Sequence, residues 1–374
     1  MPYKVLFVNP AKHYLGIRDE VLRAIDDVLI RGDLIMRRDV AEFEKKIARY
    51  IDTKYAISLN SGTDALFFAL KAAGIGPGDE VITVSHTFVA SVSAIVQTGA
   101  KPILVDVAED FLMDMDKVEE AVTPNTKAII PVHLNGRVCD MEKLLDIAFR
   151  QRLSIIEDAA QAMGAQYQIK REGFVEWRKA GSFGLAGCFS LYPFKVLGCF
   201  GDGGILTTNN DELAEKIRLL RDHGQKTKTE LVCYGLNSRL DNLQAAILNV
   251  KFKYLDKWIE RRQQIADLYN DGLEKIPGVT IPPEAGDNRV DIYQNYVLRA
   301  TRRDELAAFL NEKGVETLIK DPIPLHYHPG LNLSHFHLPV SERLAKEVIS
   351  LPVYPELDDD QVKIVIEAVK SFYL

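Results

Sequence analysis

The sequence predicts an α/β fold, with a large domain built on a mainly parallel sheet that helices cover on both faces, and a smaller C-terminal α+β domain. First, strand-like and helix-like segments alternate between residues 55 and 158, which is typical of parallel sheets. Second, the apolar run Ser154–Asp158 ends in an acid, as when a buried parallel strand presents a carboxylate at the edge of a sheet. Third, 374 residues are enough for two domains of ordinary size.

The N-terminal part begins with two predicted helices, Arg18–Arg31 and Arg38–Tyr50, in which apolar residues recur at helical spacing. A short strand, Tyr55–Leu59, leads into Asn60-Ser61-Gly62-Thr63-Asp64 and then into an apolar helix. A small polar turn between a strand and a helix start is an anion-binding arrangement, because free N–H groups and the helix dipole both face the ligand. The same residue types are the usual helix N-caps, so this motif alone leaves both interpretations open.

The alternation continues as far as the acid at position 158. We expect strands at Glu80–Val84, Lys101–Asp106, Thr126–Val132 and Ser154–Asp158, and helices at Phe88–Thr98, Asp116–Val122 and Met141–Gln151. Connections such as IGPGDEV contain the glycine and proline of turns. Strands that alternate with helices in this way predict a mainly parallel sheet with both faces covered.

The second half of the chain divides near the start of a long helix. We expect strands at Cys188–Leu191, Ile205–Thr208 and Tyr296–Leu298, helices at Asp211–His223, Leu255–Ile276, Arg303–Lys313 and Asp359–Phe372, and a polar loop at Lys320–Leu333. The long helix ends at Pro277-Gly278, which is a common stop signal. We therefore assign residues 1–250 to the large domain and residues 251–374 to the small one.

Composition indicates a globular protein with neither nucleic-acid nor membrane partners. The net charge of −7 does not favour binding to nucleic acid or to anionic membranes, and no apolar run is long enough to span a bilayer. The four cysteines are scattered without a CxxC pair, so we expect no metal site and a reduced, cytoplasmic location. The first residues lack the basic-then-apolar pattern of a signal peptide.

The stretch from Ser154 to Thr208 contains the residues that indicate chemistry. Asp158 closes a strand, Ser190 offers a hydroxyl, and Lys195 precedes a glycine-rich turn. Alone, such an acid is more often a helix cap and such a lysine is usually solvated. Together and in this order they suit pyridoxal phosphate, because the lysine amine forms a Schiff base, the carboxylate keeps the pyridine nitrogen protonated, and hydroxyls and amides hold the phosphate.

Five ordered motifs resemble the DegT/DnrJ/EryC1/StrS group of sugar aminotransferases, a branch of the fold-type-I pyridoxal-phosphate enzymes. They are NSGTDAL (60–66), HTFVAS (86–91), EDAAQA (157–162), FSLYPFKVLGCFGDGG (189–204) and LNSRLDNLQAAIL (236–248). The resemblance covers nearly the whole chain. It implies the fold of the type I pyridoxal-phosphate transferases, with residues 1–250 as the cofactor-binding domain.

The resemblance also implies a role for individual residues. Lys195 would be the Schiff-base lysine and proton shuttle, and Asp158 would pair with the pyridinium nitrogen. The other implied cofactor contacts are Gln161 to the ring hydroxyl, Gly62, Thr63 and Ser190 to the phosphate, and Phe88 against the ring face. Without the resemblance, Phe88 is as readily a core aromatic. Asn237 matches a residue that reaches into the neighbouring subunit's site, which implies a homodimer with shared sites.

Substrate-side candidates lie in three places. They are Tyr192, Arg239 and the cluster His326-Tyr327-His328. No acid closely flanks the alternating histidines, so a loop that contacts the substrate is favoured over a metal site, and an ordinary surface loop is the competing interpretation. Relatives often have His where this chain has Met163, which cannot hydrogen-bond strongly, and this leaves any substrate contact at that position in doubt.

The implied reaction moves an amino group from L-glutamate to a keto-sugar linked to a nucleoside diphosphate, by ping-pong kinetics. The form YPxKxLGxxGDGG with HTF upstream resembles members that act on 3-keto sugars, so we favour amination at C-3. Members that remove a hydroxyl carry His at the lysine position, which Lys195 argues against. The alternatives are a 4-keto sugar, an inosose-type cyclitol, a pyridoxal-phosphate lyase, or a non-catalytic regulator, although no basic DNA-binding segment is evident.

Overall fold

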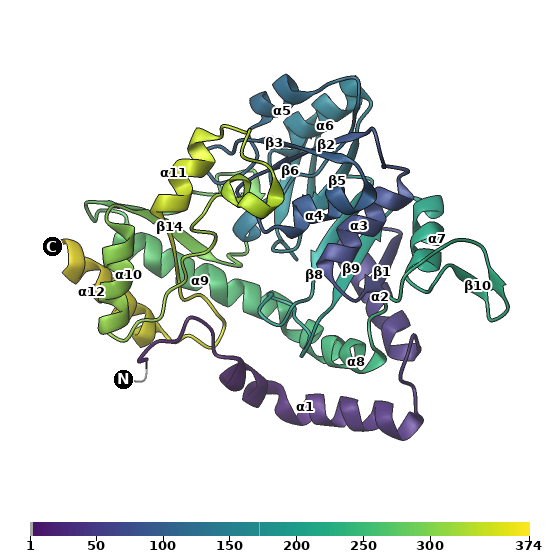
Figure 1. The fold of residues 1–374 in the computed structure, drawn as a ribbon. Coiled ribbons are helices and arrows are strands. Elements are labelled where there is room, and N and C mark those ends of the chain that lie inside the picture. Colours follow the sequence, from purple (N-terminus) through teal and green to yellow (C-terminus); the bar gives the residue numbers. More distant parts are fainter. Residues whose placement is uncertain (1–2, 172) are drawn as a thin grey trace.

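A seven-stranded sheet forms the centre of the computed structural model, which describes residues 3–171 and 173–374 (Figure 1). The strand order is β1 (Tyr55–Leu59), β9 (Gly204–Thr208), β8 (Ala186–Ser190), β5 (Ser154–Asp158), β4 (Thr126–Ile129), β2 (Glu80–Val84) and β3 (Lys101–Val105). β9 runs antiparallel to both of its neighbours, and the other strands share one direction. The predicted mainly parallel sheet is confirmed.

Successive residues of the central strands point into two different cores, which is why helices cover both faces. Ile156 and Leu206 pack on one face, and their neighbours Ile155 and Ile205 pack on the other. The first face is covered by α3 (Gly62–Ala72), α4 (Ala90–Thr98) and α7 (Asp211–Leu220), and the second by α2 (Arg38–Ile51), α5 (Met115–Ala121), α6 (Met141–Gln151) and α8 (Asn242–Lys251). Figure 1 shows the helices on both sides of the strands.

Most predicted elements are present, and the differences have local causes. Helix α1 (Pro10–Arg31) begins at Pro10 rather than at Arg18, because the Asn9 side chain caps it by accepting a hydrogen bond of 2.9 Å from the Lys12 amide. Helix α4 begins at Ala90, so Phe88 lies in the loop before it rather than in the helix.

Two hairpins lie where no strand was predicted. β6 (Gln166–Arg171) and β7 (Phe174–Lys179) pair with each other, and β6 also pairs with β13 (Arg289–Val290). Charged residues interrupt the apolar alternation of this hairpin, which concealed it in the sequence. β10 (Gln225–Thr227) and β11 (Glu230–Leu231) form a second hairpin that projects from the body of the molecule (Figure 1).

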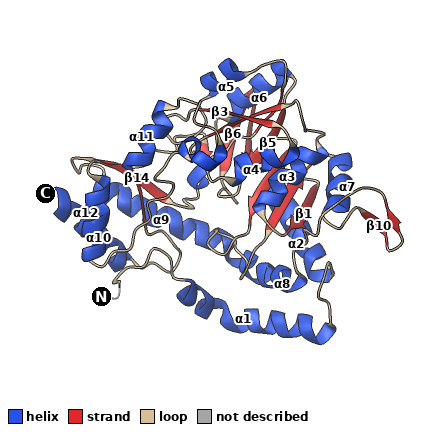
Figure 2. Cartoon of the chain, in the orientation of Figure 1, coloured by secondary structure: helices blue, strands red, loops and turns tan. Residues whose placement is uncertain are grey.

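The C-terminal part is a smaller α+β unit (Figure 2). Its antiparallel sheet has the order β12 (Val279–Thr280), β14 (Tyr296–Ala300) and β15 (Val348–Leu351), and its helices are α9 (Leu255–Leu273), α10 (Arg303–Glu312), α11 (Pro339–Glu347) and α12 (Asp359–Tyr373). Short 3₁₀ turns lie at η1 (Leu134–Gly136), η2 (Phe252–Tyr254), η3 (Leu325–Tyr327) and η4 (Pro329–Leu331). None of the helices in the described residues combines the length and the apolar character needed to cross a membrane.

The division at residues 250 and 251 stays a prediction, and several contacts cross it. Val5, near the N-terminus, forms a bridge with Val315 and lies in the C-terminal core. In the opposite direction, the short strand Arg289–Val290 pairs with β6. Each part therefore contributes a segment to the structure of the other.

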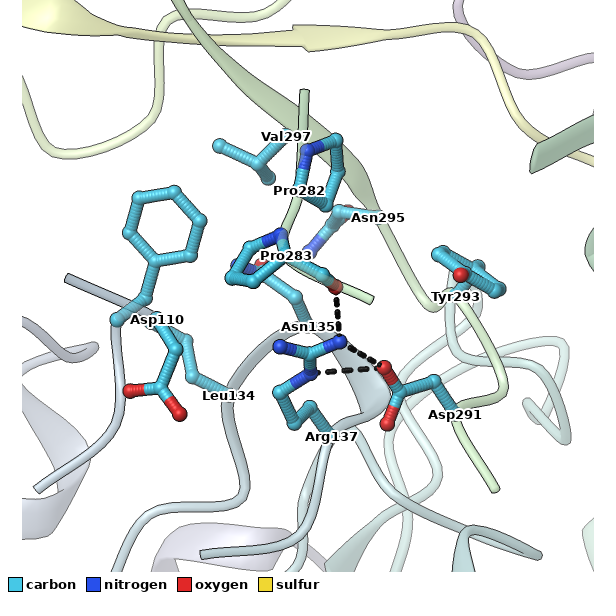
Figure 3. Close-up of a pocket in the computed structure, with 11 residues that line it drawn as sticks. Asp110, Leu134, Asn135, Arg137, Pro282, Pro283, Asp291, Tyr293, Asn295 and Val297 are labelled. Carbon is cyan, nitrogen blue, oxygen red and sulfur yellow. Dashed lines mark hydrogen bonds and ion pairs between the residues drawn. The ribbon is translucent and has the colours of Figure 1, made fainter. Parts of the chain in front are cut away.

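A buried ion pair also ties the two parts together (Figure 3). The Arg137 guanidinium donates to Asp291 from Nε over 2.7 Å and from Nη2 over 2.6 Å, and it also donates to the Pro283 carbonyl. Both charged side chains are buried. Burial raises the pKa of Asp291, and the positive charge of Arg137 acts against that rise. The ion pair lines a cavity of only about 20 Å³, so its role is structural.

Replacing Arg137 by Met should lower the free energy of unfolding by about 3–5 kcal/mol, because Asp291 would keep a buried charge without a partner. Urea unfolding followed by circular dichroism measures this change. Arg150→Met is the control, since its partner Glu119 and the arginine itself stay in water, and it should change the midpoint far less. Equal effects of the two variants would contradict a structural role for the buried pair.

Candidate active site

A pocket of about 530 Å³ lies at the carboxyl end of the central strands. It is lined by Ser61, Gly62, Thr63, Leu66, Thr87, Phe88, Ala90, Val132, His133, Leu134, Asp158, Ala160, Gln161, Ser190, Tyr192, Lys195, Asp202, Gly203 and Lys320. Ligands of α/β proteins bind at this edge because the loops and helix N-termini converge there. Sequence-predicted cofactor residues from four separate motifs meet in this one pocket, and of the predicted set Asn237 alone does not line it.

One end of the pocket is built for an anion. The Ser61 hydroxyl caps α3 by accepting from the Asp64 amide over 3.1 Å, and the first amides of a helix have no partners within it. At Gly62 an added Cβ would lie 2.9 Å from the Ser190 Cβ, and at Gly204 one would lie 2.2 Å from the Ser61 backbone. Both positions therefore require glycine. The close packing brings the first amides of α3 and the Ser190 hydroxyl together at one end of the pocket, and this group of donors forms a cradle suited to a phosphate.

Asp158 presents its carboxylate at the end of β5. Its side chain is 6% exposed, and its two oxygens accept hydrogen bonds from the Ser91 hydroxyl over 2.7 Å and from the Ala160 amide over 3.2 Å. These donors hold the group as an acceptor, with lone pairs left for a ligand. A charged carboxylate in this position fits a protonated ring nitrogen.

The carboxylate of Glu157, the residue before Asp158, anchors the loop that precedes β8. It is fully buried, and its oxygens accept from the amides of Gly181, Phe183 and Gly184 over 2.6, 2.7 and 2.8 Å. The fourth donor is His133 Nε2 at 3.0 Å, while His133 Nδ1 accepts from the Cys139 amide over 3.2 Å. The loop that leads into β8 is therefore bound to the end of β5.

Lys195 lies in the turn after β8, where its backbone amide donates to the Tyr192 carbonyl over 2.9 Å. The turn is tight, since an added Cβ at Gly198 would lie 2.5 Å from that same carbonyl oxygen. Burial, and then the positive charge of Lys320, lower the pKa of the Lys195 amine to about 8, while the charge of Asp158 acts in the opposite direction. An amine with this pKa is partly neutral near pH 8, which a nucleophile and proton carrier requires.

Gln161 and Phe88 complete the predicted cofactor contacts within the pocket. The Gln161 side-chain oxygen accepts from the Asn135 amide over 2.7 Å, which leaves its NH₂ group to donate to a ligand oxygen. Phe88 is 56% exposed in this chain, with an open face for a planar ring. Together with the carboxylate, the cradle and the lysine, these groups match the hydrogen-bonding and charge pattern of pyridoxal phosphate.

Of the substrate-side candidates, only Tyr192 lines this pocket. Arg239 forms an ion pair of 3.0 Å with Asp222 and donates to Asn237, which is exposed. Neither of these two residues, nor Tyr327, lines the pocket of its own chain. Any contact they make with a ligand requires a second subunit or a rearranged loop.

The predicted substrate contact of His326 is wrong for this structure. His326 is fully buried, with Nδ1 at 2.7 Å from the Ser85 hydroxyl and Nε2 at 3.3 Å from Glu342. Both ring nitrogens are occupied, so this residue anchors its loop, and only the neighbouring Tyr327 and His328 side chains reach solvent. Met163 is likewise a core residue, 6% exposed, and does not line the pocket.

Sequence reasoning missed several pocket residues. Thr87 and Asp202 lie within two of the motifs already quoted, and His133 directly follows a predicted strand, so a closer examination of these segments would have found them. Lys320 comes from the far C-terminal part, in a stretch with no recognisable motif. Only the tertiary structure brings it to the site.

Residues 16–370 match the model of the DegT/DnrJ/EryC1/StrS aminotransferase family. The chain belongs to this family. The predicted family and its aminotransferase class of enzyme are confirmed. The family match spans both the large domain and the C-terminal part that supplies Lys320, so the two parts belong to one enzyme.

Similar proteins and solved structures cover nearly the full length of this family member. It is 44% identical to a pleiotropic regulatory protein of Geobacillus stearothermophilus, over 99% of this chain and 98% of that relative. It is 42% identical to dTDP-3-amino-3,4,6-trideoxy-alpha-D-glucose transaminase of Streptomyces venezuelae, over 99% of this chain and 96% of that relative. Among solved structures, S. venezuelae DesV in complex with a ketimine intermediate superposes with a TM-score of 0.94, at 40% identity over 100% of this chain and 99% of DesV. The fold of the pyridoxal-phosphate transferases is thus confirmed.

Because the Lys195 amine has a lowered pKa, protein freed of cofactor should take up pyridoxal phosphate at a rate that rises with pH and reaches half of its maximum around pH 8, instead of near the ordinary lysine value of 10.5. The sign follows because only the neutral amine attacks an aldehyde, and a lower pKa makes that form available at lower pH. Stopped-flow absorbance measures the rate. A rate that still increases above pH 10 would contradict the assignment, and Lys195→Ala should show no such phase.

Proposed function

We propose that this protein is a pyridoxal-phosphate-dependent aminotransferase that transfers the amino group of L-glutamate to a keto-sugar linked to a nucleoside diphosphate. The single observation that carries the proposal is the convergence of Asp158, Gln161, Ser190 and Lys195 on one pocket beside the N-terminus of α3. The cofactor would act there as an electron sink, which weakens bonds at the carbon attached to the amine.

Each residue of the pocket has a task in this proposal. Lys195 holds the cofactor and moves a proton between two carbon atoms, and its lowered pKa suits both steps. Asp158 keeps the ring nitrogen protonated, and Gln161 donates to the ring oxygen. Gly62, Thr63 and Ser190 hold the phosphate, while Phe88 covers the ring. Among the described residues, no group of three or more His, Cys, Asp or Glu side chains is arranged to hold a metal ion.

Amination at C-3 is the form of the reaction that we propose. Two relatives bear on it: the S. venezuelae enzyme named above, whose name contains 3-amino, and the UDP-2-acetamido-2-deoxy-3-oxo-D-glucuronate aminotransferase of Pseudomonas aeruginosa, 38% identical over 98% of this chain and 99% of that relative. A pocket that serves two substrates through one lysine implies alternate occupancy, and hence ping-pong kinetics.

A 4-keto sugar or an inosose-type cyclitol would use the same chemistry, and the position of the amine in the product separates these substrates. A lyase would use the same electron sink but break a different bond. A regulatory role also has a supporting observation, because one relative is named as a pleiotropic regulatory protein. The complete set of cofactor residues favours catalysis, since a regulator has no need of a lysine with a lowered pKa.

We propose a cytoplasmic homodimer with shared active sites. The hairpin β10–β11 projects from the molecule, and large apolar side chains on it and just after it are exposed, with Leu231 at 70% and Tyr234 at 97%. Exposed apolar residues grouped in this way are typical of an interface. Asn237 follows directly, so a partner that covers the hairpin would receive Asn237 near its own pocket. The cysteines Cys139, Cys188, Cys199 and Cys233 are all free, which suits a reduced compartment.

The visible absorption spectrum before and after addition of L-glutamate tests the function. The purified protein should show the band of a lysine-bound cofactor, and glutamate should replace it with the band of the aminated cofactor. Lys195→Ala should abolish turnover. Full activity of that variant, or no band after added pyridoxal phosphate, would contradict the proposal and favour the regulatory role.

Purified heterodimers of Lys195→Ala with Asn237→Ala subunits should test site sharing. Each variant alone should be impaired. If Asn237 serves the partner's site, one of the two sites in the heterodimer is intact and about half of the wild-type activity returns. If Asn237 serves its own chain, both sites carry a defect and activity stays low.

A further inference from the structure

Lys320 enters the proposed active site from the C-terminal part of the chain. It lines the 530 Å³ pocket together with Lys195 and Asp158. Burial lowers the pKa of Lys320, while the negative charges of Asp321 and Asp158 act in the opposite direction. Within residues 3–171 and 173–374, its ammonium makes neither a hydrogen bond nor an ion pair. A partly buried ammonium without a partner is costly, so a ligand that fills the pocket should supply negative charge beside it.

The phosphate of the cofactor is not that negative charge. Lys320 also lines a small adjoining cavity with His86, Thr87 and Asn135, and none of the phosphate-end residues Gly62, Thr63 and Ser190 lines this cavity. Asn135 is the residue whose amide donates to Gln161. The ammonium therefore lies on the Gln161 side of the pocket, away from the cradle that receives the phosphate.

An amino donor carries an anion at the required place. The α-carboxylate of an amino acid is bonded to the carbon that bears the amine, so it must lie close to Lys195 during transfer of that amine. Lys320 is close enough to Lys195 to affect the pKa of its amine. Of the described residues that line the pocket, only Lys195 and Lys320 carry an amino group, and none is an arginine; in the proposed function Lys195 is committed to the reaction.

We propose that Lys320 binds the α-carboxylate of the amino donor. This assignment rests on the proposed aminotransferase function. Asp321, although adjacent in sequence, does not come within ion-pair distance of the Lys320 ammonium, so the ammonium is available to a substrate. The C-terminal part of the chain thereby contributes directly to recognition of the donor.

The test compares the cofactor-loaded wild type with Lys320→Met, Lys320→Arg and the control Lys346→Met, which removes an exposed lysine of α11. Three probes are used: L-glutamate, 4-aminobutyrate, which is glutamate without the α-carboxylate, and glutarate, which has two carboxylates and no amine. The cofactor absorbance change at increasing concentration gives the saturation constants for the two amines. Isothermal titration calorimetry gives the dissociation constant of glutarate and needs no chemical step.

Lys320→Met should raise the saturation constant for L-glutamate about ten- to hundredfold, as expected for a lost charge-assisted hydrogen bond. The saturation constant for 4-aminobutyrate should stay unchanged. Glutarate should also bind more weakly. Lys320→Arg should recover most of the affinity, and Lys346→Met should match the wild type. Equal weakening of both amines would overturn the assignment to the α-carboxylate.

Other outcomes separate this proposal from its alternatives. Unchanged glutamate and glutarate binding, with a loss confined to the keto-sugar step, would assign Lys320 to the sugar and overturn the proposal. Unchanged saturation constants with a slower rate for both amines would show that Lys320 acts only by lowering the pKa of the Lys195 amine. That result would overturn the proposal. If the wild type reacts with no amine, the proposed function fails, and the glutarate titration still decides whether Lys320 binds a carboxylate.

Discussion

The buried carboxylate of Glu157 is the interaction on which the site depends. Its oxygens accept hydrogen bonds from His133 and from three backbone amides of the loop before β8. These hydrogen bonds hold that loop against the end of β5. A buried charge is tolerated only when such donors satisfy it. Because β8 ends at Ser190 and the turn of Lys195 follows it, this anchored carboxylate helps to fix the position of Lys195 relative to Asp158.

Close backbone packing gives the pocket its shape. At Gly62 and Gly204 there is no room for a Cβ, because α3 begins against β8 and β9. This packing places the helix N-terminus, the Ser190 hydroxyl and the tight turn of Lys195 around one volume. The pocket lining has two origins in the chain, because most of its residues lie before position 204 and Lys320 comes from the C-terminal part.

Features with a local cause were readable from the sequence. The helix α6 and the strands β1, β2 and β5 have the predicted bounds, because periodicity and turn residues act within a few positions. Asp158 and Lys195 were recognised because a carboxylate at a strand end and a lysine before a glycine-rich turn each follow from local pattern. His326 was misjudged, since a histidine in a polar loop gives no local sign that Ser85 and Glu342 will enclose it.

The sequence by itself determined the fold class and the family, and it predicted a set of cofactor residues, since these depend on residue type and on order along the chain. Only the tertiary structure decided which of those residues share a pocket, that Asn237 and Arg239 lie outside it in their own chain, and that Lys320 enters it. Contacts between residues more than a hundred positions apart depend on how two cores pack. No periodicity or motif records that packing, so the place of Lys320 in the pocket was found only in three dimensions.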